Sequence, residues 1–220
     1  NLQATGIRNM AEGSSIQPQK KILVIVPTYN EGLNVGPLVE TIIKLNIPVD
    51  LLFVDDNSQD NTQQQILKLQ ENTSLKIGLL KRAKKLGLAS AYTTGFKWGL
   101  ERGYEFLCEM DADLSHRPQD LLRIVQSASL SPVVVGSRYI EGGNTINWSL
   151  IRRLISRFGS FYARSILGLK VADLTGGFNL WHRNVLKKIA LDNIQSEGYS
   201  FQIELKYRRS EEHTSELQSP

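Results

Sequence analysis

The sequence has only one cysteine among its 220 residues, and it lacks any apolar run long enough to span a membrane. One cysteine excludes an internal disulfide. Because Cys108 lies within an apolar, strand-like run, we expect a buried structural thiol rather than a nucleophile. The first residues also lack the hydrophobic core of a signal peptide. Together these absences favour a reducing, cytoplasmic compartment.

Two phosphate-binding signatures are absent as well. No GxGxxG follows the first apolar run, and GxxxxGK[ST] occurs nowhere in the chain, which argues against a dinucleotide oxidoreductase and a P-loop enzyme. If the protein binds phosphate groups, a metal ion and arginine would have to balance their charge. The formal net charge of +4 is modest, and we expect no nucleic-acid partner.

The two ends of the chain lack the pattern of a folded domain. Residues 1–19 are polar and have no periodicity, so we expect a disordered N-terminal extension in which Met10 is a candidate start. Residues 209–219 read RSEEHTSELQS, which resembles a translated sequencing adapter. We therefore expect one domain over residues 20–208, incomplete at its C-terminal end, and a non-native tail over residues 209–220. A genuine polar tail is the alternative.

Apolar runs alternate with segments of helical periodicity along the body of the chain. The runs are continuous and rich in β-branched residues, as in parallel strands that are buried on both faces. We expect strands near residues 20–26, 49–54, 75–80, 104–108 and 133–135, and helices near 35–43, 60–70, 88–100 and 118–127, with Asn30 as the first N-cap. Small residues at Ala91, Gly95 and Gly99 favour close packing of the third helix. This order predicts a doubly wound, mostly parallel α/β sheet with flanking helices.

Polar side chains gather where four of these strands end. In such sheets, ligands bind beyond the carboxyl ends of the strands, so this placement favours a binding site. The residues concerned are Tyr29, Glu31, Asp55, Asp56, Asp111, Asp113 and Arg138.

The acids Asp111 and Asp113 are the most informative pair. Residues two apart on a strand face the same side, so the two carboxylates can share one crevice. Like charges this close need a positive partner, and a hard divalent cation that also binds phosphate oxygens would supply it. A polar turn after the strand is the alternative reading.

Six segments follow one another in an order that resembles a known family. They are PTYNE (27–31), FVDDNSQDNT (53–62), MDADLSH (110–116), VGSRY (135–139), DLTGGF (173–178) and GYSFQIELKYR (198–208). The chain resembles the family 2 inverting glycosyltransferases, and among them most the polyprenol (dolichol) phosphate mannosyltransferases. The resemblance covers roughly residues 20–208.

The resemblance implies a GT-A fold, a nucleotide-sugar donor such as GDP-mannose, a divalent metal (Mg²⁺ or Mn²⁺) and a polyprenyl phosphate acceptor. It places Asp113 on the metal, and Ser115 stands where many relatives have a glutamine as second ligand. Arg138 would contact donor or acceptor phosphate and, with Asp113, would be catalytic. The other residues implied to bind the nucleotide are Pro27, Tyr29, Glu31, Val54, Asp56, Asp111 and Ala112.

The acceptor side is less defined by the sequence. A lipid phosphate is largely ionised at neutral pH, so it needs positioning more than deprotonation. Glu204 is a candidate catalytic base, with a helix-surface acid as the alternative, and residues 173–177 are expected to form an acceptor-side loop. His116 and His182 have no partners at metal-ligand spacing, and we interpret both as structural.

Residues 150–169 have apolar residues at helical spacing with four arginines off the apolar stripe. Such a helix can lie on an anionic membrane or pack on its own domain. The resemblance favours the membrane, which predicts a peripheral protein at the cytoplasmic face. Two alternatives to the mannosyltransferase remain. One is a family 2 enzyme with UDP-glucose or another donor or acceptor, and the other is a non-catalytic nucleotide-binding or receiver-like module.

Overall fold

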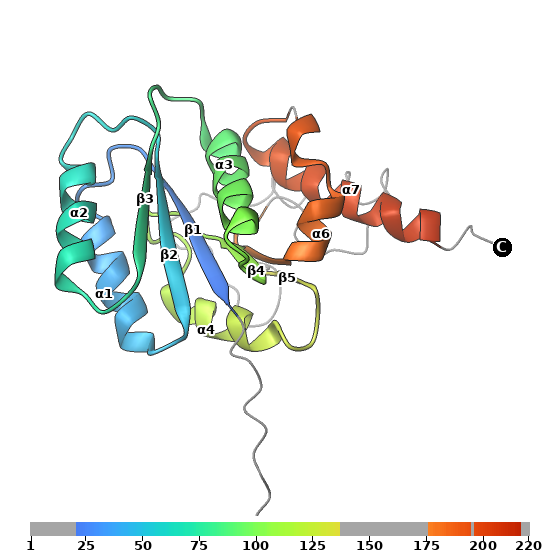
Figure 1. Cartoon of the computed structure of the whole chain (residues 1–220), viewed down its shortest axis with the longest axis horizontal. Coiled ribbons are helices and arrows are strands. Elements are labelled where there is room, and N and C mark those ends of the chain that lie inside the picture. The colour runs from blue at the N-terminus through green and yellow to red at the C-terminus, as the bar shows by residue number, and fades with distance from the viewer. Residues whose placement is uncertain (1–20, 137–175, 195, 217–220) are drawn as a thin grey trace, which may run out of the picture.

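The computed structural model of the protein describes residues 21–136, 176–194 and 196–216 (Figure 1). Its described strands form one sheet in the order β3-β2-β1-β4-β6-β5. The strands are β1 (Ile22–Thr28), β2 (Val49–Asp55), β3 (Ile77–Lys81), β4 (Phe106–Glu109), β5 (Val133–Val135) and β6 (Asn179–His182). The helices are α1 (Val35–Leu45), α2 (Thr62–Asn72), α3 (Leu88–Glu101), α4 (Pro118–Ser127), α6 (Arg183–Lys188) and α7 (Tyr199–Glu216), with a 3₁₀ turn η1 (Leu191–Asn193).

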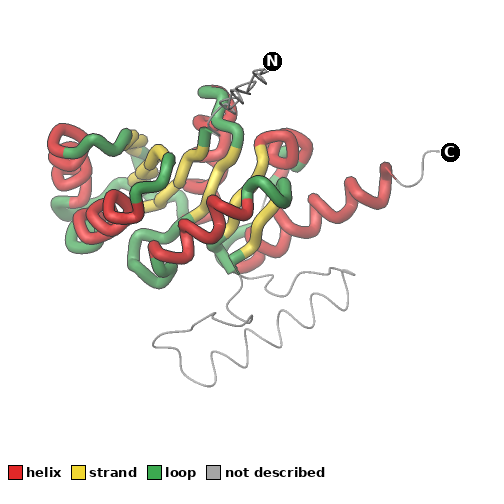
Figure 2. The backbone as a smooth tube through the Cα atoms, turned by 90° about the horizontal axis from the view of Figure 1, so that it is seen from below, coloured by secondary structure: helices red, strands yellow, loops and turns green. Residues whose placement is uncertain are grey.

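The first four strands pair in parallel, and β6 runs antiparallel to both β4 and β5. Along β1, Val24 and Val26 pack on one face of the sheet, while Leu23 and Ile25 pack on the other. Helices α1, α2 and α4 contribute to the first core, and α3, α6 and α7 to the second. Figure 2 shows the sheet with helices on both of its sides. Continuous apolar strands therefore reflect burial on both faces.

Helix α3 approaches the sheet closely through its glycines. A Cβ atom at Gly95 would lie 2.4 Å from Cγ2 of Ile25, and one at Gly99 would lie 2.5 Å from Cδ2 of Leu107. The expectation of close packing along this helix is thus confirmed.

The predicted mostly parallel α/β sheet is confirmed, and each of the nine predicted elements is present with small shifts at its ends. The N-cap prediction is wrong. Asn34 precedes α1, whereas Asn30 has a φ of 59°, and its side-chain oxygen accepts a hydrogen bond from the N–H of Gln59. Strand β4 ends at Glu109, so the alternation argument does not apply to the acids that follow it. Asp113 lies in a turn, and Asp111 lies between the strand and that turn.

Some sequence-based expectations fall outside the described residues. They concern Arg138, the amphipathic segment 150–169, and residues 173–175 of the expected acceptor-side loop. Helix α7 continues through Glu216, which lies within the segment that resembles an adapter. Within the described ranges, no helix combines the length and apolar character needed to cross a bilayer.

Candidate functional site

A cavity of about 320 Å³ opens beyond the carboxyl ends of β1, β2 and β4. Its walls come from four loops that follow β1, β2, β3 and β4, and from the start of α3. The lining residues are Pro27, Thr28, Tyr29, Glu31, Asp56, Lys85, Gly87, Leu88, Ala91, Asp111, Ala112 and Asp113. The structure therefore brings together seven residues that the sequence assigned to the nucleotide: Pro27, Tyr29, Glu31, Asp56, Asp111, Ala112 and Asp113.

The loops after β1 and β2 hold each other in place. The N–H of Asn30 donates to Oγ of Ser58 at 2.9 Å, and the Asn30 side chain accepts from the N–H of Gln59 at 2.8 Å. The N–H of Glu31 donates to Oγ1 of Thr62, also at 2.8 Å. Two segments that are about thirty residues apart in the sequence therefore form one rigid wall of the cavity.

Asp55 has a structural role in this wall. Its carboxylate is fully buried and accepts from the hydroxyls of Thr28 and Ser58 at 3.1 and 2.6 Å. It also accepts from Nε2 of Gln63 at 2.6 Å. Because its oxygens are occupied by the protein, Asp55 supports the loop and does not line the cavity.

Asp56 lines the cavity and also holds the loop that closes one side of it. Its carboxylate accepts from the N–H groups of Leu86 and Gly87 at 2.9 and 2.8 Å, and Nη1 of Arg82 lies 3.1 Å away. Both members of this ion pair are nearly buried, with side-chain exposures of 6% for Asp56 and 8% for Arg82. The described contacts thus give Asp56 a clear role in fixing the loop.

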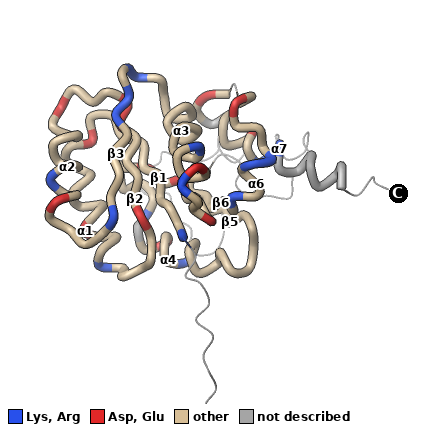
Figure 3. The backbone as a smooth tube through the Cα atoms, viewed as in Figure 1, with Lys and Arg blue, Asp and Glu red and all other residues tan. Residues whose placement is uncertain are grey.

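The same loop brings a cation to the mouth of the cavity. Nζ of Lys85 lies 3.6 Å from the centroid of the Tyr29 ring, which is within cation–π range. Figure 3 shows lysine and arginine residues along the connection that follows β3. The sequence showed this connection as a basic run, but it did not show that Asp56 draws the loop to the cavity.

Asp111 is held from two sides. The hydroxyl of Tyr92 donates to Oδ1 of Asp111 at 2.8 Å, and the Asp111 N–H donates to Nδ1 of His116 at 3.1 Å. The His116 ring in turn stacks on Phe178, with ring centroids 4.9 Å apart. Burial, together with the charges of Asp111 and Glu109, raises the pKa of Tyr92 well above its usual range. The phenol therefore remains a hydrogen-bond donor at neutral pH.

Asp113 is exposed at the rim of the cavity, and its Oδ1 accepts from the N–H of Ser115 at 2.9 Å. Ser115 is also exposed but does not line the cavity. Within the described ranges, no group of three histidine, cysteine or acidic residues is placed to hold a metal ion. The available donors are a carboxylate and a hydroxyl, which suit a hard cation that takes its other ligands from phosphate and water. The oxygen donors of Asp113 and Ser115 are therefore of the type that Mg²⁺ and Mn²⁺ bind.

Other predicted residues lie elsewhere. Val54 is fully buried in the core beneath α3, so its side chain does not line the cavity. Arg138 lies outside the described residues. Glu204 lies on α7, where it accepts from Nη2 of Arg208 at 2.7 Å, and it does not line the cavity. His182 caps α6 by accepting from the N–H of Asn184, as expected for a structural histidine.

The sequence did not predict a buried polar network that is centred on Glu109. Glu109 is fully buried and accepts from Asn179, Trp181 and Gln202 at 2.8, 2.9 and 2.8 Å. Burial raises the pKa of Glu109, although these hydrogen bonds oppose the shift. The network joins β4 to β6 and α7. An acid at the end of an apolar strand was its only sequence signal.

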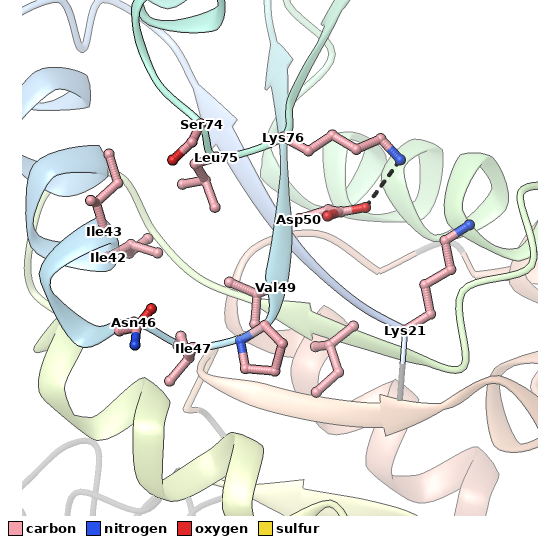
Figure 4. Close-up of a pocket in the computed structure, with 12 residues that line it drawn as sticks. Lys21, Ile42, Ile43, Asn46, Ile47, Val49, Asp50, Ser74, Leu75 and Lys76 are labelled. Atoms are coloured by element: carbon pink, nitrogen blue, oxygen red, sulfur yellow. Dashed lines mark hydrogen bonds and ion pairs between the residues drawn. The ribbon is translucent and has the colours of Figure 1, made fainter. Parts of the chain in front are cut away.

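A second groove, of about 560 Å³, lies at the amino ends of β1 and β2 (Figure 4). Two of its lining residues, Asp50 and Lys76, pair at 3.2 Å, and Asp50 also accepts from the hydroxyl of Tyr104, which lies outside the lining, at 2.5 Å. Since ligands of parallel α/β sheets bind at the carboxyl ends of strands, the first cavity is the better candidate.

The sequence is similar to those of known glycosyltransferases. The model of glycosyl transferase family 2 matches residues 23–190. A polyprenol monophosphomannose synthase from Mycolicibacterium smegmatis is 38% identical over 211 residues, covering 94% of this chain and 80% of that protein. An undecaprenyl-phosphate mannosyltransferase from Micrococcus luteus is 42% identical over 190 residues, covering 86% of this chain and 77% of that protein.

Two solved structures share the fold. Glucosyl-3-phosphoglycerate synthase from Mycobacterium tuberculosis, in complex with Mn²⁺, UDP and glucosyl-3-phosphoglycerate, has a TM-score of 0.62 at 18% identity, with 84% of this chain and 63% of that chain covered. A mannosyltransferase from Pyrobaculum calidifontis, in complex with GDP-mannose and Mn²⁺, has a TM-score of 0.54 at 21% identity, with 78% and 47% covered. The chain thus spans less than two thirds of either solved chain.

Proposed function

Because the chain belongs to glycosyl transferase family 2, we propose that it transfers mannose from GDP-mannose to a polyprenyl phosphate, with inversion at the sugar carbon. The observation that carries the proposal is the cavity at the carboxyl ends of the strands. Its walls are the loops that contain the family-like segments, and two relatives with about 40% identity are named as enzymes of this kind.

In this proposal the nucleoside lies against Pro27, Tyr29 and the backbone of Ala112. The carboxylates of Glu31 and Asp111 accept hydrogen bonds from its base or ribose, because carboxylates are acceptor-only groups when ionised. Asp56 contributes by holding the loop of residues 82–87 at the cavity.

The diphosphate requires positive charge in a cavity that is mainly acidic. Glu31, Asp56, Asp111 and Asp113 line the cavity, and Lys85 is the cation among the described lining residues. Asp113, with Ser115 nearby, would hold a Mg²⁺ or Mn²⁺ ion against the diphosphate. When bound, such an ion stabilises the negative charge that develops on the departing nucleoside diphosphate.

The acceptor phosphate is the nucleophile. One of its ionised oxygens forms the bond to the anomeric carbon while the bond to the nucleoside diphosphate breaks, so a general base is not required. Arg138 would orient donor or acceptor phosphate. We further propose that residues 20–208 form the catalytic domain, and that it works peripherally at the cytoplasmic membrane face through residues 150–169.

The direct test is transfer of radiolabelled mannose from GDP-mannose to a polyprenyl phosphate, with UDP-glucose as the competing donor. We expect Mn²⁺- or Mg²⁺-dependent transfer, and a drop in kcat of about a hundredfold in Asp113→Asn, as for the loss of one charge-stabilising group. The matched control is Glu101→Gln, which also removes one carboxylate charge. Glu101 is exposed at the end of α3, so this variant should retain full activity. Transfer of glucose but not mannose would instead favour the UDP-glucose alternative.

Membrane association is tested separately by flotation with vesicles. We expect binding that increases with anionic lipid and decreases with salt, because the arginines of residues 150–169 would contact the lipid head groups. Flotation that is independent of anionic lipid would contradict this part of the proposal.

A further inference from the structure

Tyr92 contacts the site without lining it. It lies on α3, its side chain is fully buried, and its hydroxyl donates to Oδ1 of Asp111 at 2.8 Å. The Asp111 side chain is 32% exposed, and its second oxygen, Oδ2, lies 3.8 Å from Nε2 of His116. The Tyr92 hydroxyl is therefore the closer of these two contacts to the carboxylate. A charged acceptor at 2.8 Å makes the hydrogen bond one of the stronger kind.

The phenol ring is itself held by distant parts of the chain. It stacks on Phe201 of α7, with centroids 6.4 Å apart and planes within 5°, and on Phe96 of its own helix. On the other side of Asp111, His116 stacks on Phe178, which precedes β6. Both groups that hold Asp111 therefore rest on aromatic rings from the C-terminal part of the chain.

We propose that Tyr92 is a positioning residue of the donor site, which holds the Asp111 carboxylate toward the cavity and links its orientation to α7. The inference rests on the proposed donor site. Tyr92 makes no contact with the ligand. Its hydroxyl holds Oδ1 of Asp111, while His116 accepts a hydrogen bond from the backbone N–H of the same residue and lies 3.8 Å from Oδ2.

The test uses Tyr92→Phe, which removes the hydroxyl and keeps the buried ring. Titration of GDP in the presence of Mn²⁺ should show affinity weakened by about tenfold, since a hydrogen bond to a charged group is lost. In the transfer reaction the KM for the donor should rise while kcat changes little, because the lost interaction binds substrate and transition state alike. A purely structural role would instead lower the melting temperature and leave affinity and KM unchanged.

Tyr104→Phe is the matched control. Tyr104 is also a buried tyrosine whose hydroxyl donates to an aspartate, in this case Asp50 at the amino end of the sheet. We expect this variant to bind GDP as the wild type does. Wild-type affinity in Tyr92→Phe, or an equal loss in Tyr104→Phe, would overturn the proposal.

A second measurement is independent of the ligand. Amide hydrogen exchange in residues 111–116 should be faster in Tyr92→Phe than in the wild type. Unchanged exchange would overturn the proposal for Tyr92, whether or not the wild type binds nucleotide. Failure of the wild type to bind GDP would contradict the proposed function instead. If Tyr92→Phe does not fold, Phe201→Leu keeps the hydroxyl and removes the stacked ring. Its GDP affinity should fall by a few fold, and unchanged affinity would refute the link to α7.

Discussion

Single acids in this protein have separate roles that depend on what surrounds them. Asp55 and Asp56 are adjacent in the sequence, yet the first braces a loop from within and the second fixes a neighbouring loop at the cavity. Asp111 is held by Tyr92, and Asp113 remains exposed. Burial and hydrogen-bond partners, rather than residue type, separate supporting acids from those that can meet a ligand.

The ion pair of Asp56 and Arg82 predicts a large effect on stability. Asp56→Asn should lower the free energy of unfolding by about 3 kcal/mol, because the nearly buried Arg82 loses its partner charge. It should also weaken GDP binding, since the loop of residues 82–87 loses its anchor. Urea unfolding and GDP titration would measure the two effects.

The control for this variant is Asp50→Asn. Its partner Lys76 has a side chain that is 66% exposed, so the change should alter the free energy of unfolding by at most about 1 kcal/mol. Equal losses in the two variants would show that burial of the ion pair does not determine its contribution.

Cys108 predicts a simple chemical behaviour. Burial raises the pKa of its thiol well above the usual range, with a smaller contribution from Glu109. The folded protein should therefore not react with a thiol reagent such as DTNB, and one thiol per chain should react in urea. Rapid modification of the native protein would contradict the buried position.

At the scale of elements, a change from glycine to alanine should have opposite effects in α3, which contacts β1 closely, and in α1, where the glycine has free space beside it. Gly95→Ala should destabilise the protein by about 1 to 3 kcal/mol, because the new methyl group would overlap Ile25. Gly36→Ala in α1 should stabilise it by about 0.5 to 1 kcal/mol, since nothing lies within 4 Å of the new atom and alanine favours the helix. Thermal unfolding of both variants measures the difference.

Helix α7 carries a pH-dependent contribution. Burial alone would raise the pKa of Glu204, but hydrogen bonds from Ser196 and Arg208 outweigh it and hold the pKa below its usual range. A lowered folded-state pKa gives stability that is present above the unfolded value and is lost as pH falls through the folded value. Glu204→Gln should therefore be less stable than the wild type at neutral pH.

The same difference should shrink as the pH falls below the usual carboxyl pKa and through the lowered pKa of the folded protein, where the Glu204 carboxylate becomes protonated. Urea unfolding at neutral pH and at a series of lower values tests this. A difference that stays constant with pH would mean that the ionised carboxylate contributes nothing to stability.

Sequence patterns could predict the elements whose strands are long and continuously apolar. They could not predict β6, because the strand has only four residues and its first and last, Asn179 and His182, are polar. For the candidate site, the family-like segments predicted that Tyr29, Glu31 and the acids after β4 lie together. The roles of Lys85 and Tyr92 depend on contacts between loops and helices that are distant in sequence, and local patterns carry no information on such contacts.

For the whole molecule, the two-sided core means that ligand binding should stabilise the complete fold. At GDP and Mn²⁺ concentrations near a hundred times the dissociation constant, stability should rise by about 2.7 kcal/mol. This corresponds to a melting temperature several degrees higher for a chain of this size. Chelation of the metal should remove most of the increase.

The variant Asp113→Asn distinguishes the contribution of the metal to the melting temperature from that of the nucleotide. Its melting temperature should respond to GDP alone as the wild type does, but it should gain little from added Mn²⁺. An undiminished response to Mn²⁺ would place the ion on other residues.

The position of β6 in the sheet has a consequence for the order of folding. Strand β2 pairs with β1 and β3, each about 27 positions away in the chain, whereas β4 pairs with β1, about 84 positions earlier, and on its outer side with residues about seventy positions later. Such distant pairing requires closure of a long loop, which is slow. During synthesis, the half of the sheet around β1 and β2 can therefore form while β4 still exposes an unpaired edge. This interval, before residues 179–182 leave the ribosome, is when the chain is most open to pairing with another copy.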